Sequence, residues 1–308
     1  MNNKITIFNG PKKEFTKILP DTYENFTDII RIIDSKLKEV KLVTDLNDYD
    51  HDSEKLYAEN LVVYSDEYTG VNDHVIDNFI NHITMIYEID NLFLQNPPEK
   101  LRNQFKRESN GRLEIVSYPY KLIDKDILKQ IKEGFSNKII GQIHLKMDLL
   151  SVLYPLVQEQ FEKPVVILFY GPTGVGKTET ARYISTLLEG ELFRKQFSMF
   201  QNESFASYLF GQGTKQSSFA KDLLDRESNI IVLDEFDKAN QIFHSAFYQM
   251  FDEGVFVDKD HTVNLGKALI ICTSNYKSES DIKRNLGELF SRFDGDEFKL
   301  YPGLPSKQ

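Results

Sequence analysis

The chain has 308 residues and a mass of 35.8 kDa, enough for two domains or for one large domain with an extension. Hydrophobic residues make up 41% and charged residues 27%, as in an ordinary folded protein, which excludes a mainly disordered chain. The 37 basic and 47 acidic side chains give a net charge of −10, which argues against broad, sequence-independent binding to nucleic acid.

The acidic excess is concentrated in the N-terminal third. Between Asp21 and Asp90 there are 17 acidic and 5 basic side chains, a net charge of −12, so the remaining chain is close to neutral. Two interpretations of this pattern remain open: a solvated acidic surface, or a docking face for a basic partner.

The cysteine count and the length of the apolar runs indicate in which cellular compartment the protein is expected. A single cysteine, Cys272, cannot form an intramolecular disulfide bond, which favours a reducing environment. The N-terminus lacks the long apolar core of a signal peptide, and the longest good apolar run, Val165 to Tyr170, is far shorter than the ~20 residues of a membrane helix. We therefore expect a cytoplasmic protein in which Cys272 is a buried core thiol.

Residues 1–115 are expected to form a small mixed α/β or α-rich domain. Three short runs have the composition of β-strands: Ile5–Phe8, Lys41–Val43 and Leu61–Tyr64. Helix-like periodicity covers Phe26–Val40. A longer helix is predicted from near Asp73 to the break at Asn96-Pro97-Pro98.

Residues 116–308 are predicted to form a second domain of the α/β class. Helical segments are expected at Asp126–Gly134 and Gln142–Glu159, and the buried strand Val165–Tyr170 follows them. Four further segments are strand candidates: Leu192–Phe197, Asn229–Leu233, Ala268–Thr273 and Glu297–Tyr301. Because helical segments separate most of them, a mainly parallel five-stranded sheet covered on both faces is predicted.

The strongest motif follows the first of these strands. The sequence GPTGVGKT fits the phosphate-binding pattern G-x-x-x-x-G-K-[ST], and a helix is predicted at Glu179–Leu188 directly after it. Its glycines let successive backbone N–H groups face one anion, Lys177 would reach the outer phosphates of ATP, and Thr178 would ligate Mg²⁺. Contacts to the nucleotide are expected from Gly171, Pro172, Thr173, Gly174, Val175, Gly176, Lys177, Thr178 and Glu179.

Two other apolar strand candidates end in polar side chains. One ends in Asp234 and Glu235, at the edge of a parallel sheet where ligands usually bind. There Asp234 would hold Mg²⁺ through water, and Glu235 would polarise the attacking water. The other ends in Thr273-Ser274-Asn275, where Asn275 would hydrogen-bond the attacking water or the γ-phosphate; a simple asparagine turn is the alternative.

Together these motifs resemble those of AAA+ ATPases, and among them the Clp-type unfoldases and disaggregases, over roughly residues 124–304. The segment Ile139–Gln142 looks like the one that contacts the nucleotide base in that family, which assigns Ile140 to nucleotide binding. GPTGVGKTETAR and LDEFDKAN are similar to the family's phosphate loop and magnesium strand. The resemblance implies a three-layer P-loop core, ATP and Mg²⁺ as cofactors, and hydrolysis of ATP to ADP and phosphate.

A further segment, Leu289–Asp294, looks like the part of the family that carries the arginine finger, which assigns this role to Arg292. In the family the finger reaches the γ-phosphate of the neighbouring subunit, so the resemblance implies a ring or an open spiral of subunits. A surface salt bridge with Asp294 or Asp296 is the alternative for Arg292.

Two features depart from the family pattern. The interval from Leu209 to Phe219 is several residues shorter than the family's pore loop and has no tyrosine-plus-glycine tip, so pore threading is not expected and Phe219 is predicted to pack in the core. The sequence reaches Gln308 just after the last predicted strand, so we expect no C-terminal helical lid and no second-sensor arginine. In these absences it is similar to torsin-type relatives, which work with partner proteins.

The sequence thus predicts a Mg-ATP hydrolase that remodels or regulates a protein partner as a nucleotide-dependent oligomer, with residues 1–115 selecting the partner. An ATP-dependent assembly switch or scaffold with little hydrolysis, as a defence system or mobile element could use, is one alternative. A DNA-acting AAA+ ATPase is another, against which the acidic N-terminal third and the absence of a basic tract both count. No association with membranes is expected.

Overall fold

The computed structural model describes residues 4–29, 55–70, 76–108, 111–199, 204–211, 217–239, 241–294 and 298–299. The chain forms two units. Unit 1 consists of Met1–Tyr118, Gly211–Asp225 and Lys259–His261. Unit 2 consists of Pro119–Phe210, Arg226–Asp258 and Thr262–Gln308. The chain therefore passes between the units five times, and the first passage lies close to the expected division between residues 115 and 116.

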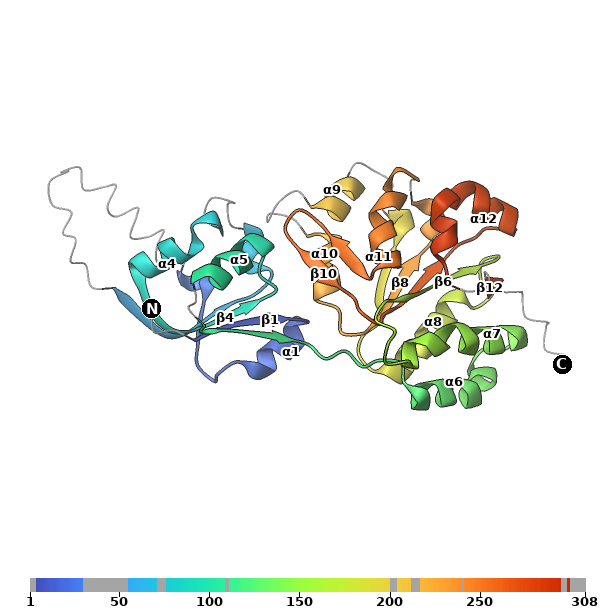
Figure 1. The fold of residues 1–308 in the computed structure, drawn as a ribbon, viewed down its shortest axis with the longest axis horizontal. Coiled ribbons are helices and arrows are strands. Elements are labelled where there is room, and N and C mark those ends of the chain that lie inside the picture. Colours follow the sequence, from blue (N-terminus) through green and yellow to red (C-terminus); the bar gives the residue numbers. More distant parts are fainter. Residues whose placement is uncertain are drawn as a thin grey trace. The chain divides into compact units, whose positions relative to one another are not determined.

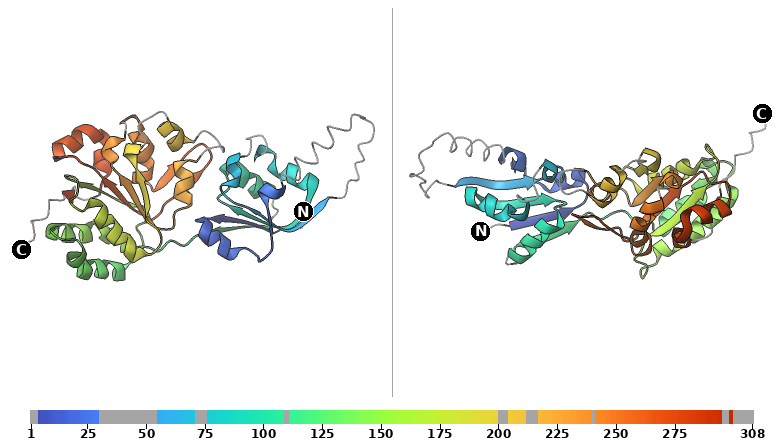
Figure 2. Two further views of the ribbon diagram at one scale, coloured as in Figure 1. Left: turned by 180° about the vertical axis from the view of Figure 1, so that it is seen from behind. Right: turned by 90° about the horizontal axis from the view of Figure 1, so that it is seen from above.

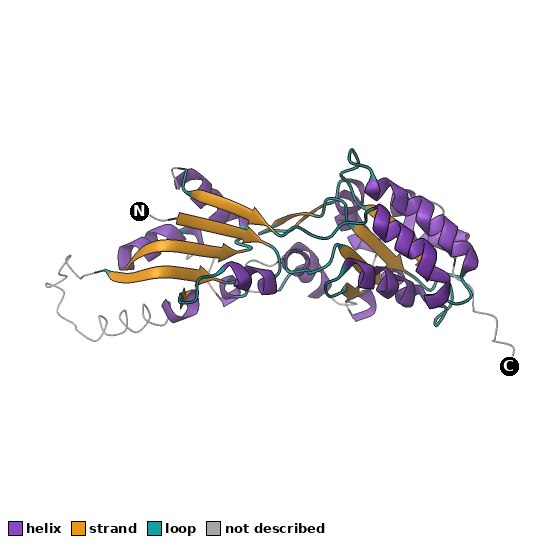
Figure 3. Cartoon of the chain, turned by 90° about the horizontal axis from the view of Figure 1, so that it is seen from below, coloured by secondary structure: helices purple, strands orange, loops and turns teal. Residues whose placement is uncertain are grey.

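Unit 1 contains a five-stranded sheet in which all paired strands are parallel, in the order β2-β3-β4-β1-β5 (Figure 1). Its strands are β1 (Lys4–Asn9), β2 (Glu24–Asn25), β3 (Leu56–Val63), β4 (Tyr87–Gln95) and β5 (Leu113–Ser117). In Figure 3 the main strand arrows of this unit point the same way. Two of the three predicted strands are confirmed in β1 and β3, and the one predicted at Lys41–Val43 lies outside the described residues.

Helices cover both faces of this sheet. On one face lie α4 (Phe79–Ile86) and α5 (Glu99–Glu108), and on the other lies the short α1 (Lys12–Phe15), followed by the 3₁₀ turn η1 (Thr16–Ile18) (Figure 1). Because side chains alternate along a strand, Ile5 and Ile7 of β1 join the larger core under α4 and α5, whereas Phe8 packs with Phe15 of α1. A second 3₁₀ turn, η2, spans Glu67–Gly70.

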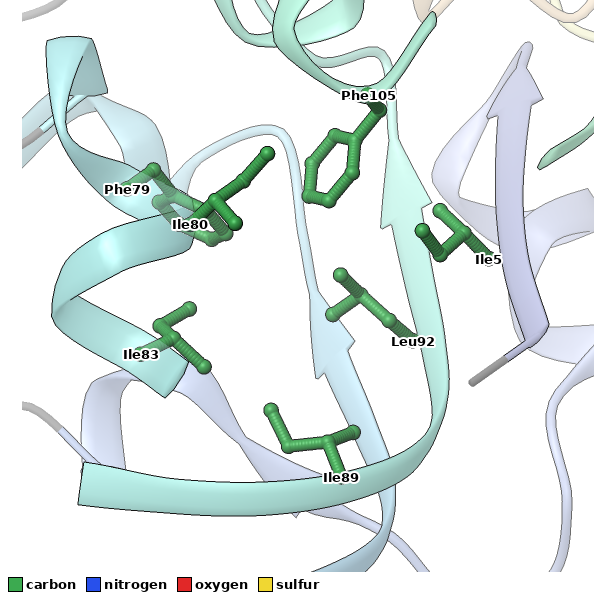
Figure 4. A pocket seen from close by; sticks show the side chains of 7 residues that line it. All are labelled: Ile5, Phe79, Ile80, Ile83, Ile89, Leu92 and Phe105. Atoms are coloured by element: carbon green, nitrogen blue, oxygen red, sulfur yellow. The ribbon is translucent and has the colours of Figure 1, made fainter. Parts of the chain in front are cut away.

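A small pocket lies within the larger core (Figure 4). Its lining comes from β1, β4, α4 and α5: Ile5, Phe79, Ile80, Ile83, Ile89, Leu92 and Phe105. All seven side chains belong to the buried core and none carries a polar group, so the pocket is a feature of packing.

The long helix predicted from near Asp73 to Asn96 is wrong. Helix α4 ends at Ile86, and Tyr87–Gln95 is the longest strand of unit 1. Along Tyr87–Asp90 buried and exposed side chains alternate, which is the period of a half-buried strand. The strand lies between β3 and β1, and pairing on both sides fixes its conformation.

Helix α10 (Phe219–Leu224) comes late in the sequence but belongs to unit 1. Phe219 is fully buried, which confirms its predicted packing role. Just after the helix, Asp225 accepts hydrogen bonds from the backbone N–H of Lys12 (2.7 Å) and from the side-chain amide of Gln95 (3.1 Å), at the carboxyl edge of the sheet. Burial raises the pKa of Asp225, while these two hydrogen bonds oppose the shift.

Unit 2 contains a second five-stranded parallel sheet, in the order β12-β6-β11-β8-β7, which confirms the predicted α/β class. Its strands are β6 (Val165–Tyr170), β7 (Phe193–Gln196), β8 (Ile230–Asp234), β11 (Leu269–Thr273) and β12 (Phe298–Lys299). Each corresponds to a segment predicted from sequence. An antiparallel hairpin, β9 (Val255–Val257) with β10 (Thr262–Asn264), was not predicted.

Helices enclose the second sheet in a three-layer arrangement (Figures 1 and 2). On one face lie α6 (Lys125–Lys138), α7 (Ile143–Leu153) and α8 (Lys177–Leu188). On the other lie α11 (Tyr248–Asp252) and α12 (Glu279–Leu286). The remaining helical segments are η3 (Tyr154–Val157), η4 (Phe197–Met199), α9 (Ser204–Phe210), η5 (Phe236–Lys238), η6 (Gln241–Phe247) and η7 (Gly287–Arg292). Cys272 is buried in β11, as predicted.

Among the described residues, no helix combines the length and the apolar character that crossing a bilayer requires.

Candidate nucleotide-binding site

The predicted site residues come together because the strands of unit 2 are parallel. The carboxyl ends of β6, β11, β8 and β7 lie along one edge of the sheet, and each strand is followed there by a polar segment. This edge is where open α/β sheets usually bind ligands.

The phosphate loop connects β6 to the start of α8. Three of its glycines, Gly171, Gly174 and Gly176, have φ values of 135°, 83° and 100°, which L side chains rarely adopt. Helix α8 starts at Lys177 without a side-chain cap, whereas α6 and α12 are capped by Asp124 and Ser278. An uncapped helix start after a glycine-rich turn leaves backbone N–H groups available to an anion.

Lys177 is held by the loop that it follows. Its Nζ donates to the carbonyl oxygens of Gly171 (2.8 Å) and Pro172 (2.8 Å) and to Oδ1 of Asn275 (3.2 Å). The residue is buried, and burial lowers the pKa of Lys177, while the negative charges of Asp234 and its neighbours act in the opposite direction. The structure thus brings Lys177 and Asn275 together, as a phosphate site requires.

Asp234 ends β8 and is buried. Its Oδ2 accepts from Nε of Arg194 (2.8 Å) and also from Nη2 of the same guanidinium. Its Oδ1 accepts from the hydroxyl of Thr273, the last residue of β11. Both carboxylate oxygens therefore have donors from the two strands that flank β8.

Glu235 follows in a left-handed backbone conformation (φ 54°, ψ 43°), which turns the chain sharply at the strand end. Its N–H donates to Oγ1 of Thr273 (3.0 Å), and its Oε2 accepts from Nε2 of Gln196 (3.0 Å). Hydrogen bonds from Ser198 and Gln196 lower the pKa of Glu235, so its side chain is a carboxylate at neutral pH.

The segment after β11 completes this edge. The N–H of Asn275 donates to Oδ1 of Asp237 at 3.3 Å. Ser274 is buried, and its Oγ has no hydrogen-bond partner among the described residues. A buried hydroxyl without a described partner, one residue before Asn275, is consistent with a site that a polar ligand completes.

The residues predicted for the nucleotide base lie on the other side of the loop. Gln142 is buried and its Nε2 donates to the carbonyl of Val175 (3.2 Å), which ties this segment to the phosphate loop. Ile140 is 81% exposed, an unusual setting for an isoleucine and one that leaves it available to an apolar ligand surface. Thr178 is half-buried in the first turn of α8, and Glu179 is exposed.

Arg292 makes its contacts elsewhere in unit 2. Its Nε pairs with Oδ2 of Asp252 (2.9 Å), its Nη1 donates to the carbonyl of Glu288 (2.9 Å), and its guanidinium lies over the ring of Tyr248 (4.1 Å). The alternative for Arg292, a surface salt bridge, is present in the structure, but its partner is Asp252 and not Asp294. Asp294 accepts the N–H of Val166 (2.8 Å), and Asp296 lies outside the described residues.

The donor set fits a magnesium nucleotide. Magnesium usually keeps several waters and takes one or two protein oxygens plus phosphate oxygens, and Asp234 and Thr178 supply one carboxylate and one hydroxyl. The uncapped start of α8 and Lys177 would meet the phosphates. The types of residue present at this edge therefore fit Mg-ATP.

Four contacting residues were not predicted from sequence: Arg194, Gln196, Ser198 and Thr273. Arg194 and Gln196 are two residues apart in β7, so their side chains lie on the same face of the strand. Two polar side chains on one face of a parallel strand indicate a polar site there. The sequence places Thr273 in the polar segment that ends a strand, but it indicates no role for this residue. Its contacts to Asp234 and Glu235 depend on strand register, which the sequence does not reveal.

Residues 162–298 match the protein family described as "AAA domain (Cdc48 subfamily)". This part of the chain is similar to AAA domains. The match covers the phosphate loop, the carboxylates that end β8 and the polar end of β11, which meet at one edge of the sheet.

The chain is also similar to Clp proteins. The chain is 36% identical over 162 residues to the chaperone protein ClpB of Chlamydia caviae, covering 48% of this chain and 19% of that protein. It is 28% identical over 185 residues to the ClpA homolog protein of Fuscovulum blasticum, covering 56% of this chain and 23% of that protein.

A third relative is the ATP-binding subunit ClpL of a Clp protease from Staphylococcus aureus, 28% identical over 201 residues, 56% of this chain and 28% of that protein. The chain thus spans about a fifth to just over a quarter of the length of these relatives. The similarity supports an ATPase of Clp type, and the geometry of the site is consistent with it.

Proposed function

We propose that this protein is a Mg-ATP hydrolase that remodels or regulates a protein partner as a nucleotide-dependent oligomer. The observation that carries the proposal is the convergence of Lys177, Asn275, Asp234 and Glu235 at one sheet edge beside an uncapped helix start. These groups have the charges that in-line phosphoryl transfer to water needs, which supports the proposal.

The chemistry follows from where these side chains lie. Lys177 and the start of α8 would bind the β- and γ-phosphates, and Asp234 with Thr178 would hold Mg²⁺, which neutralises phosphate charge. Glu235 stays ionised at neutral pH and would orient and polarise the attacking water. Asn275 would donate to the γ-phosphate or to that water, so most of the catalysis is positioning and charge stabilisation.

We assign to Arg292 the role of arginine finger in a neighbouring subunit. In the single chain it pairs with Asp252 at the surface and is part of no contact described above for the phosphate loop. An exposed ion pair of this kind is weak and can be exchanged for a stronger contact to a phosphate. This assignment predicts that ATP binding assembles the subunits.

Unit 1 is proposed to select the partner. Its described residues include exposed acidic side chains at both ends of the acidic segment, among them Glu24, Asp28, Asp66 and Asp90. Such a surface favours a basic partner through charge complementarity. We propose no threading through a central pore.

ATP turnover tests the proposal. In wild-type protein we expect steady release of phosphate, which Glu235→Gln should lower by about a hundredfold while ATP still binds. Glu253→Gln is the matched control, because Glu253 is an exposed carboxylate that also accepts from a glutamine, Gln249 (3.0 Å). Failure of the wild-type protein to bind ATP at all would overturn the proposal.

Size measurements with Glu235→Gln test the oligomer separately. We expect a larger species with ATP than without it, and we expect Arg292→Ala to lower turnover without lowering ATP affinity. A protein that stays monomeric at every concentration and in every nucleotide state would contradict the role of Arg292.

An ATP-dependent assembly switch with little hydrolysis is the second candidate. The observation that favours it is that both catalytic carboxylates are already engaged, Asp234 by Arg194 and Glu235 by Gln196. Binding and assembly without turnover, even with the partner present, would identify the protein as a switch.

A further inference from the structure

Arg194 occupies a position that the proposed reaction does not explain. It lies on β7, the edge strand of the sheet in unit 2, and its guanidinium donates twice to the same oxygen of Asp234. Lys177, another cation of the site, donates to two carbonyls of the phosphate loop and to Asn275. Arg194 is therefore the cation that directly neutralises Asp234.

A buried carboxylate needs such a partner. The side chain of Asp234 is 7% exposed, and a carboxylate removed from water is destabilised unless a cation or strong donors compensate for the lost hydration. Thr273 donates to Oδ1, and Arg194 supplies both the remaining hydrogen bonds and the opposite charge at Oδ2. With both oxygens engaged, the carboxylate has fewer positions left to accept from the waters of a metal ion.

Magnesium at this site would supply the same compensation. A divalent cation held through water beside Asp234 would neutralise the carboxylate, and it would also repel a guanidinium at 2.8 Å from that carboxylate. Arg194 can leave at little cost because its side chain is 40% exposed and its head group can return to water. Among the described strands β7 pairs with β8 alone, so fewer ladder hydrogen bonds hold it than hold the inner strands.

We propose that Arg194 is a positioning residue that competes with Mg²⁺ for Asp234. In the nucleotide-free protein Arg194 stabilises the carboxylate, and arrival of Mg-nucleotide displaces the guanidinium from it. The inference rests on the proposed function, since it requires a magnesium nucleotide at this edge.

The test measures the Mg²⁺ concentration at which a fluorescent ATP analogue reaches half of its magnesium-dependent gain in affinity. For Arg194→Gln we expect this concentration to fall about fivefold, because a competing positive charge has been removed. Arg194→Lys keeps the charge and loses the paired donation, so we expect an intermediate value. Arg284→Gln is the matched control, since Arg284 forms an exposed ion pair with Asp281 (2.5 Å).

A second measurement uses the nucleotide-free protein. We expect Arg194→Gln to lower the melting temperature in the absence of Mg²⁺ and Mg-ADP to restore most of the loss, because either cation compensates Asp234. A half-saturating Mg²⁺ concentration that is unchanged or higher in Arg194→Gln would overturn the proposal. If the glutamine variant does not fold, the same concentration measured for Arg194→Lys is compared with the wild-type value instead. If the wild-type protein bound no nucleotide either with or without magnesium, the proposed function itself would fail.

Discussion

Asp234 and Glu235 are adjacent in the sequence, yet two different side chains of one strand hold them. Arg194 donates to Asp234, and Gln196, two residues further along β7, donates to Glu235. Because alternate residues of a strand point to the same face, a single short strand controls both carboxylates. A small displacement of β7 would break both of these contacts, while Thr273 of β11 would still donate to Asp234.

The contact to Glu235 leads to a prediction about basal turnover. Removing the amide in Gln196→Ala should free Glu235 to turn towards the nucleotide, so we expect basal ATP hydrolysis to rise by about three- to tenfold. Gln249→Ala serves as the control, because Gln249 makes an equivalent hydrogen bond to Glu253 away from the site. A fall in turnover would instead mean that Gln196 holds Glu235 in its reactive position.

ATP binding should be coupled to the uptake of a proton by Lys177. Burial lowers the pKa of Lys177 below its usual value of 10.5, and bound phosphates would raise it again. Between the two values binding takes up a proton, so at alkaline pH below 10.5 the heat of binding should depend on the ionisation enthalpy of the buffer. Lys177→Arg should bind ATP without this dependence, since arginine stays protonated; equal proton uptake in both proteins would contradict the prediction.

The site residues that the sequence predicts are those that belong to one continuous motif. Lys177 and Thr178 belong to one loop, and Asp234 and Glu235 end one strand, so their spacing is visible in the sequence. Arg194 and Thr273 reach Asp234 from the two flanking strands, and that contact is decided by register.

At the scale of elements, the contact between α6 and α8 depends on one glycine. A Cβ at Gly134 would lie 2.6 Å from the hydroxyl of Tyr183, which donates to the carbonyl of Gln130 (3.2 Å). Helix α8 carries Lys177 at its start, so its packing against α6 positions the phosphate loop.

Gly134→Ala should therefore destabilise the protein although alanine favours helix. We expect a loss of about 1 kcal/mol, since crowding and the broken hydrogen bond outweigh the gain in propensity. The measurement is the free energy of unfolding in denaturant. In Tyr183→Phe the hydroxyl is gone and Gly134→Ala should become neutral or stabilising; stabilisation in the wild-type background would refute the argument.

Strands with uniform apolar composition were easier to predict than the elements of unit 1. β6, β8 and β11 are buried along their whole length, and their runs of aliphatic residues match that environment. Tyr87–Gln95 mixes polar and apolar residues and adjoins a true helix, so its pattern was read as helical. Pairing with β1 and β3, which are distant in sequence, decides its structure.

At the scale of the whole molecule, the division into units does not follow the order of the chain. Helix α10 lies between two segments of unit 2, but its contacts place it in unit 1. Phe219 and Leu223 of this helix are fully buried, and Asp225 joins the carboxyl edge of the first sheet.

A fragment of residues 119–308 should therefore be prone to aggregation. It retains α10 but lacks the strands of unit 1, and exposing two large apolar side chains costs roughly 2 kcal/mol each. We expect the fragment to bind a hydrophobic dye and to aggregate in size-exclusion chromatography. Phe219→Ser with Leu223→Ser should restore its solubility, whereas a monomeric, dye-negative fragment would show that α10 does not need unit 1.

The five passages between the units also constrain how such a protein changes over evolutionary time. Two modules joined by a single linker can be exchanged by one recombination event, and each can then acquire substitutions independently. Here an exchange of the first 118 residues would leave residues 211–225 and 259–261 matched to a sheet that is no longer present. The two units are thus expected to be inherited together, with substitutions in one compensated by substitutions in the other.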